Sequence, residues 1–136
     1  MYAEIQDQRI RQLFLYLEQT LNRFSQALKT IPEGLPFIID ATVHLFRLCF
    51  ELYWKLLQKI CEYEGFIVYS WREIFVKSYS MRLINNEKMW LRILKDIDLI
   101  KEIHDEQISI EIYYTLQDYY EIMEKTYQDL KNKFSI

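Results

Sequence analysis

The chain has few of the residues that break or bend a backbone. It contains two glycines and two prolines among 136 residues. A β-rich protein of this length would need more turn residues, so this shortage favours long helices. Both prolines and one glycine fall within residues 30–36, which marks the clearest break in the chain. The length and the 51% hydrophobic content predict one domain, residues 1–136, with a substantial core.

Residues that bind metals or form disulfides are equally scarce. The two cysteines, Cys49 and Cys61, fall on one predicted helix and would lie ~18 Å apart along its axis, which is beyond the reach of a disulfide. They are therefore expected to be buried thiols in a reducing compartment. With only two histidines besides, no set of residues has the spacing of a zinc site. We expect neither a metal nor another cofactor.

The chain also lacks the features of a secreted or membrane protein. Its first residues have neither the basic start nor the apolar run of a signal peptide. No uncharged run approaches the ~18 residues that a membrane span needs. These absences predict a cytoplasmic protein with no membrane partner.

Apolar residues recur at steps of three and four along most of the chain, which is typical of amphipathic helices. The predicted fold is all-α, an antiparallel up-and-down four-helix bundle with an additional short helix. Gly65 is expected to end the second helix, Ser70 with Glu73 to cap the third, and Asn86 and Asp105 to cap later ones. The predicted helices cover residues 3–29, 39–64, 71–82, 90–106 and 108–134.

Charge is unevenly distributed, although the net charge is only -3. Between Arg72 and Lys101 there are seven Lys and Arg against four Asp and Glu, whereas between Glu102 and Glu124 there are seven acids and no base. Phosphate is disfavoured near the acidic stretch, so its tyrosines are expected to serve packing rather than stacking on RNA. RNA is therefore a less favoured partner than a protein.

Residues 90–106, here called the signature helix, carry the most informative pattern. Their apolar face combines Trp90, Leu94 and Ile97 with His104 near its end. The segment resembles the signature helix of the HEPN proteins, in the branch of nucleotidyltransferase substrate-binding proteins, where the pattern is Trp-Leu-x-x-Leu-x-Asp-Arg-Asn-x-x-x-His-x-Tyr-Asp-Glu. The frame residues of that pattern are all present: Trp90, Leu91, Leu94, Asp96, Asp105 and Glu106.

The resemblance extends over residues 37–127. Residues 50–65 are similar to the family's second-helix pattern of Phe-Glu-x-x-Trp-Lys followed by Glu-x-Glu-Gly. The resemblance implies a homodimer that works with a minimal (MNT-type) nucleotidyltransferase in a toxin–antitoxin-like pair. In members that cut RNA, it implies that the signature Arg binds phosphate and the His acts as general acid or base.

This sequence departs from the family pattern at the positions that carry that chemistry. Ile97 stands at the Arg position, Asp98 at the orienting position, Glu102 at the His position and His104 at the Tyr position. A wider spacing of six residues would fit His104, but the Arg is still missing. A carboxylate at 102 would repel the phosphate that it must approach. Ile97 is explained equally well as a core or interface residue, and His104 as a capping or surface residue.

We therefore predict a non-catalytic binding protein, a homodimeric partner of a small nucleotidyltransferase. No catalytic residue is assigned. The predicted dimer surface combines the signature helix with the broad apolar face of residues 39–64. Two alternatives remain: a metal-independent ribonuclease toxin that uses Asp98, Glu102 or His104, and a structural dimerisation bundle without a partner. The expected binding surface comprises Trp90, Asp98, Glu102, His104 and Asp105.

Overall fold

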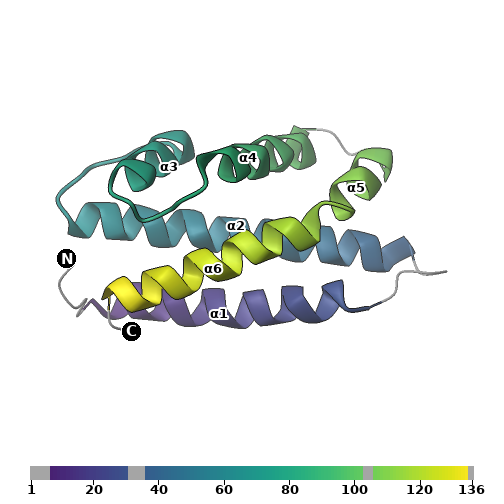
Figure 1. Ribbon diagram of the computed structural model, residues 1–136, viewed down its shortest axis with the longest axis horizontal. Coiled ribbons are helices and arrows are strands. Elements are labelled where there is room, and N and C mark those ends of the chain that lie inside the picture. Colours follow the sequence, from purple (N-terminus) through teal and green to yellow (C-terminus); the bar gives the residue numbers. More distant parts are fainter. Residues whose placement is uncertain (1–6, 31–35, 103–105, 135–136) are drawn as a thin grey trace.

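The structure is a computed structural model, which describes residues 7–30, 36–102 and 106–134. These residues form an all-α fold, as predicted. The helices are α1 (Gln8–Leu28), α2 (Pro36–Tyr63), α3 (Trp71–Ser80), α4 (Glu87–Glu102), α5 (Glu106–Tyr113) and α6 (Leu116–Phe134). The four long helices run back and forth along the long axis of the molecule (Figure 1). None of the described helices is long and apolar enough to cross a membrane.

Helix α2 is the centre of the bundle. Figure 1 shows α1 along one side of it, α3, α4 and α5 along the other, and α6 crossing diagonally. The broad apolar face of α2, which the sequence predicted to take part in a dimer surface, is buried inside this chain. That expectation is wrong, because the face already packs against neighbouring helices. Its buried residues are Val43, Phe46, Cys49, Phe50, Tyr53, Leu56, Leu57, Ile60 and Cys61.

Both cysteines are free and buried, as predicted. Burial raises the pKa of both thiols, most strongly that of Cys49. These thiols therefore behave as small apolar core residues, with little thiolate character at neutral pH.

Local signals in the sequence fix several helix ends. Gly65 adopts a φ of 93°, and the amide of Phe66 donates to the Cys61 carbonyl at 2.9 Å, which closes the C-terminus of α2. The Ser70 hydroxyl accepts from the Glu73 amide at 3.1 Å and caps α3. Asn86 Oδ1 accepts from the Met89 amide at 3.3 Å, before α4. These three predicted ends are confirmed, whereas Asp105 lies outside the described residues.

The last predicted helix, residues 108–134, is wrong as a single element. It is divided into α5 and α6 at Thr115, whose amide and hydroxyl both donate to the Ile112 carbonyl, at 2.9 and 2.6 Å. The residues before the division, Tyr113 and Tyr114, are aromatic and favour helix only weakly. The bend allows α5 to lie beside α2 and α4, while α6 crosses α2 toward α1.

Candidate functional site on the fourth helix

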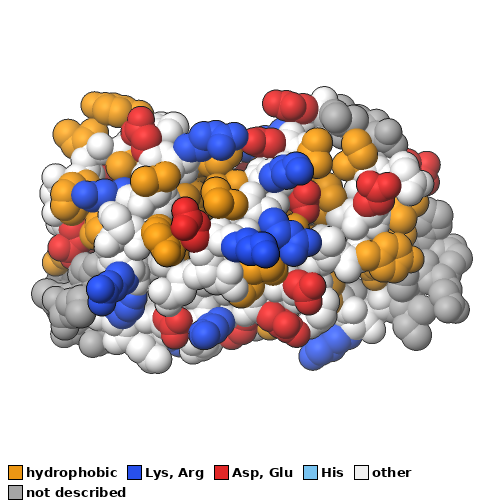
Figure 2. Space-filling view, turned by 45° about the horizontal axis from the view of Figure 1, so that its top comes forward, with side chains coloured by type: hydrophobic (Ala, Val, Ile, Leu, Met, Phe, Trp, Pro, Cys, Tyr) orange, Lys and Arg blue, Asp and Glu red, His pale blue; other side chains and the backbone are white. Residues whose placement is uncertain are grey.

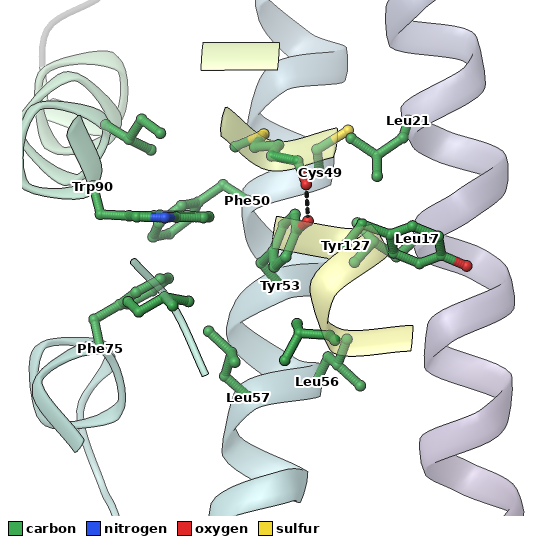
Figure 3. Packing of buried hydrophobic residues seen from close by; sticks show 14 of the residues in the cluster. Leu17, Leu21, Cys49, Phe50, Tyr53, Leu56, Leu57, Phe75, Trp90 and Tyr127 are labelled. Carbon is green, nitrogen blue, oxygen red and sulfur yellow. Dashed lines mark hydrogen bonds between the residues drawn. The ribbon is translucent and has the colours of Figure 1, made fainter. Parts of the chain in front are cut away.

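Residues 90–102 of the signature helix lie in α4, whose apolar face packs into the core, whereas Glu106 begins α5. Trp90 is 2% exposed and lies between Tyr53 and Phe75, with ring centroids 5.3 and 5.2 Å away (Figure 3). Ile97, which the resemblance aligns with a signature Arg, is 0% exposed. The spacing of these residues predicted one common face, and burial identifies that face as core.

Asp98, one of the polar residues of the candidate site, lies on the flank of α4 that faces α3. Asp98 Oδ2 accepts a hydrogen bond from Arg72 Nη2 at 3.1 Å, which joins the ends of the two helices. Arg72 also stacks on the neighbouring Trp71 ring, with its guanidinium carbon 4.5 Å from the ring centroid. The Asp98 carboxylate is therefore already paired with a cation. This partner lies 26 residues away, so sequence spacing could not identify it.

The remaining candidate residues gather little chemistry. Glu102 is exposed and is the last residue of α4. His104 and Asp105 lie outside the described residues. Among residues 7–30, 36–102 and 106–134, no three His, Cys, Asp or Glu side chains are placed to hold a metal ion. Among the described signature positions, Asp98 and Glu102 supply carboxylates and Ile97 is buried. These three positions therefore hold no pair of an arginine and a histidine.

Helices α3 and α4 form an apolar groove of about 210 Å³, with Trp90 and Arg72, the partner of Asp98, among its lining residues. Three side chains around it are exposed although they are apolar: Val76 is 72% exposed, Leu91 54% and Tyr79 46%. Figure 2 shows hydrophobic side chains gathered over the region of α3. An exposed cluster of this kind is typical of an interaction surface. Sequence reasoning missed it, although Val76 and Tyr79 are three residues apart on the side of α3 away from Ile74.

On its other flank, α4 is tied to α6. Tyr119 donates its hydroxyl proton to Asp96 Oδ2. Burial, followed by the hydrogen bond and the charge of Asp96, raises the pKa of Tyr119 to about 12. This hydrogen bond between Tyr119 and Asp96 fixes the position of α4 against α6.

This pairing predicts a loss of stability at high pH. Because the folded chain raises the pKa of Tyr119 from 10.0 to about 12, the folded state holds this proton more tightly than the unfolded state does. The stabilisation is complete below pH ~10 and is lost as the pH rises toward ~12. We expect Tyr119→Phe to weaken that dependence and to destabilise the protein by about 1–2 kcal/mol at neutral pH. Urea unfolding at pH ~8 and ~11 measures both effects.

Tyr114→Phe is the matched control, because Tyr114 is exposed. It should leave the pH dependence of wild type unchanged. If the stability of wild type and of Tyr119→Phe fell equally as the pH rose, Tyr119 would not contribute to the alkaline loss of stability. Burial also raises the pKa of Tyr53 and Tyr127, so some alkaline loss of stability remains in every variant.

The fold and this site define a helical-bundle protein with an apolar groove beside its signature helix. The chain matches the family model described as "nucleotidyltransferase substrate binding protein like" over residues 9–132, and it belongs to that family. None of the curated proteins matches the chain.

Proposed function

We propose that the protein is a non-catalytic, HEPN-like binding protein, a homodimeric partner of a small nucleotidyltransferase in a toxin–antitoxin-like complex. The observation that carries this proposal is the complete burial of Ile97 at the position of the family's signature Arg. A residue buried in the protomer core cannot reach a phosphate, and Asp98 beside it already accepts a hydrogen bond from Arg72. The family to which the chain belongs supports the nucleotidyltransferase as partner.

The dimer surface in this proposal is the groove between α3 and α4. Its exposed apolar residues would be removed from water by a second copy, and an isologous contact buries the same patch on both protomers. The nucleotidyltransferase would then contact the acidic side chains that follow α4. Glu106 and Glu111 are exposed there on α5, and Asp118 and Glu121 are exposed on α6. A basic surface on the enzyme would complement these charges.

The proposal is tested by light scattering on the purified chain and by co-purification with a small nucleotidyltransferase expressed in the same cells. Leu91→Glu should give a monomer, because it places a charge in the apolar contact. Leu15→Glu is the control, because Leu15 is 50% exposed but lies on α1. Charge reversal at Glu106 and Glu111 should weaken capture of the enzyme by about tenfold or more without changing the dimer.

Several results would contradict the proposal. If the wild-type protein were a monomer, the proposed homodimer would be wrong. If Leu91→Glu remained a dimer, the dimer contact would not be the groove between α3 and α4. Unchanged capture by the charge-reversed variant would remove the acidic contact. Cleavage of mixed RNA by wild type but not by a triple alanine variant at Asp98, Glu102 and His104 would establish the ribonuclease alternative. A folded dimer that captures no nucleotidyltransferase would support the other alternative, a structural dimerisation bundle without a partner.

A further inference from the structure

The lining of the apolar groove between α3 and α4 contains two charged residues, Arg72 and Glu87. Arg72 already has partners, because it donates to Asp98 and stacks on the Trp71 ring. Glu87 is exposed at the start of α4 and forms no ion pair with any residue that the structure describes. A second copy seated on this groove would remove the Glu87 carboxylate from water, which is unfavourable unless that copy supplies a cation.

Helix α4 itself carries a cation at a matching position. Glu87, Leu91 and Lys95 follow one another at steps of four and are all exposed, so they form one ridge on the surface of α4. Leu91 is the centre of this ridge, and the two charged residues lie about 6 Å to either side of it along the helix axis. Lys95, like Glu87, forms no ion pair within the described ranges. The ridge is therefore acidic at one end, apolar in the middle and basic at the other end.

Such a ridge is complementary to itself when two copies run antiparallel. A twofold axis beside Leu91 would bring the two Leu91 side chains together and place Glu87 of each copy opposite Lys95 of the other. Two ridges of residues four apart interdigitate when the helices cross at about 50°, which is the commonest class of helix packing. A parallel arrangement would instead bring the two Glu87 carboxylates together at one end and the two Lys95 ammonium groups together at the other, and both pairs would repel.

The position of α4 leaves room for this contact. Figure 1 shows α4 on the opposite side of α2 from α1, in the outer layer of the bundle. Lys95 lies about 40° around the helix axis from Leu91, and Glu87 lies about 40° away in the opposite sense. The Lys95 side chain also borders a hollow that α4 forms with α5 and α6. Its flexible four-carbon stem is long enough to carry the ammonium group from this flank to the other copy.

We propose that two copies of the chain cross antiparallel on α4 beside Leu91, with Glu87 of each copy paired with Lys95 of the other. This inference rests on the homodimer proposed above, and it specifies the orientation of the two protomers and the charges that select it. Exposed ion pairs contribute little affinity, whereas like charges placed opposite each other are strongly disfavoured. The two pairs therefore act mainly on specificity, because they exclude the parallel arrangement.

Charge reversal tests the pairing, with the dimer dissociation constant measured by light scattering over a range of protein concentrations. Glu87→Lys and Lys95→Glu each place like charges opposite each other at two points of a symmetric contact. We expect either single variant to weaken the dimer by about tenfold or more. The double variant Glu87→Lys with Lys95→Glu restores opposite charges at both points, and it should dimerise within about threefold of wild type.

An equimolar mixture of the two single variants gives the sharpest result. In a mixed dimer, Lys at position 87 of one copy faces Glu at position 95 of the other, and the second contact joins Glu87 to Lys95. The mixture should therefore be dimeric at a concentration where each variant alone is monomeric. This rescue requires both chains to be folded, so it separates the pairing from any loss of stability caused by removing Glu87 from the start of α4.

Two variants with matched charge changes serve as controls. Lys101→Glu alters α4 at a residue that faces α2 and the start of α3, and Asp40→Lys alters an exposed residue of α2. Both should dimerise as wild type does.

The outcomes distinguish this pairing from the homodimer itself. If Leu91→Glu gave a monomer while Glu87→Lys and Lys95→Glu dimerised as wild type does, the groove would remain the dimer contact and the pairing would be wrong. A mixture of the two single variants that stayed monomeric would overturn the antiparallel arrangement. A monomeric wild type would overturn the proposed homodimer, and this inference with it.

Discussion

Replacing Ile97 by Arg, the residue that the HEPN resemblance would place there, should destabilise the protein by about 4 kcal/mol or more. Ile97 is 0% exposed. A guanidinium at this position would be removed from water without a partner, and such a charge typically costs 3–5 kcal/mol. Since a domain of this size has a total stability of about 5–15 kcal/mol, the substitution should remove a large fraction of it. Urea unfolding followed by circular dichroism measures the loss.

Two controls separate charge burial from other effects of that substitution. Ile97→Val removes one methylene from the same site and should cost about 0.5–1.5 kcal/mol. Leu15→Arg introduces the same charge at a half-exposed position on α1 and should change stability by about 0.5 kcal/mol or less. If Ile97→Arg were as stable as wild type, the side chain would reach solvent, and the main support for a non-catalytic protein would be lost.

The same argument predicts what happens when both signature positions are restored. Adding Glu102→His to Ile97→Arg supplies the residue types of the family's cleaving pair. Glu102 is exposed at the end of α4, whereas residue 97 lies in the core, so the two groups would not share one solvent-accessible site. We therefore expect no RNA cleavage from the double variant. An Arg at position 97 would therefore disturb the packing of α4 as well as change the local chemistry.

Sequence spacing predicted the core face of α4 because helical periodicity is a local property. Trp90, Ile93, Leu94 and Ile97 recur at steps of three and four, and all four are buried. Helix ends were equally predictable where one residue decides them, as at Gly65, whose positive φ glycine adopts readily. The division at Thr115 was not, because apolar spacing continues through residues 112–116 and the bend depends on how α5 and α6 pack against different helices.

The candidate site was less predictable than the fold for the same reason. Its contacts join residues that are distant in the sequence: Arg72 with Asp98, and Asp96 with Tyr119. Spacing along one helix places a side chain on a flank, but it does not say which helix faces that flank. Exposure is likewise a tertiary property, so the apolar groove beside Leu91 was visible only after α3 and α4 had been placed together.

Trp90→Ala should be the second most damaging of the single substitutions, with an expected loss of about 3–5 kcal/mol. The indole fills the space between Tyr53 on α2 and Phe75 on α3, so its removal leaves a cavity where three helices meet. Its Nε1 is buried without a hydrogen-bond partner among the described residues, which already costs some stability. Trp90→Phe removes that unpaired donor, and we expect it to cost only about 1–2 kcal/mol.

The comparison of these two variants decides what the first residue of the signature frame does. Because Trp90 is 2% exposed, we expect the folded Trp90→Phe protein to dimerise and to capture the nucleotidyltransferase as wild type does. Unfolding curves and light scattering on the same samples measure both properties. A folded Trp90→Phe variant that lost its dimer or its partner would assign Trp90 to the binding surface through the groove that it lines. If Trp90→Phe kept its binding while Trp90→Ala lost several kcal/mol of stability, Trp90 would be a core residue and not part of the binding surface. In that case the role of Trp90 is to position α4 against α2 and α3.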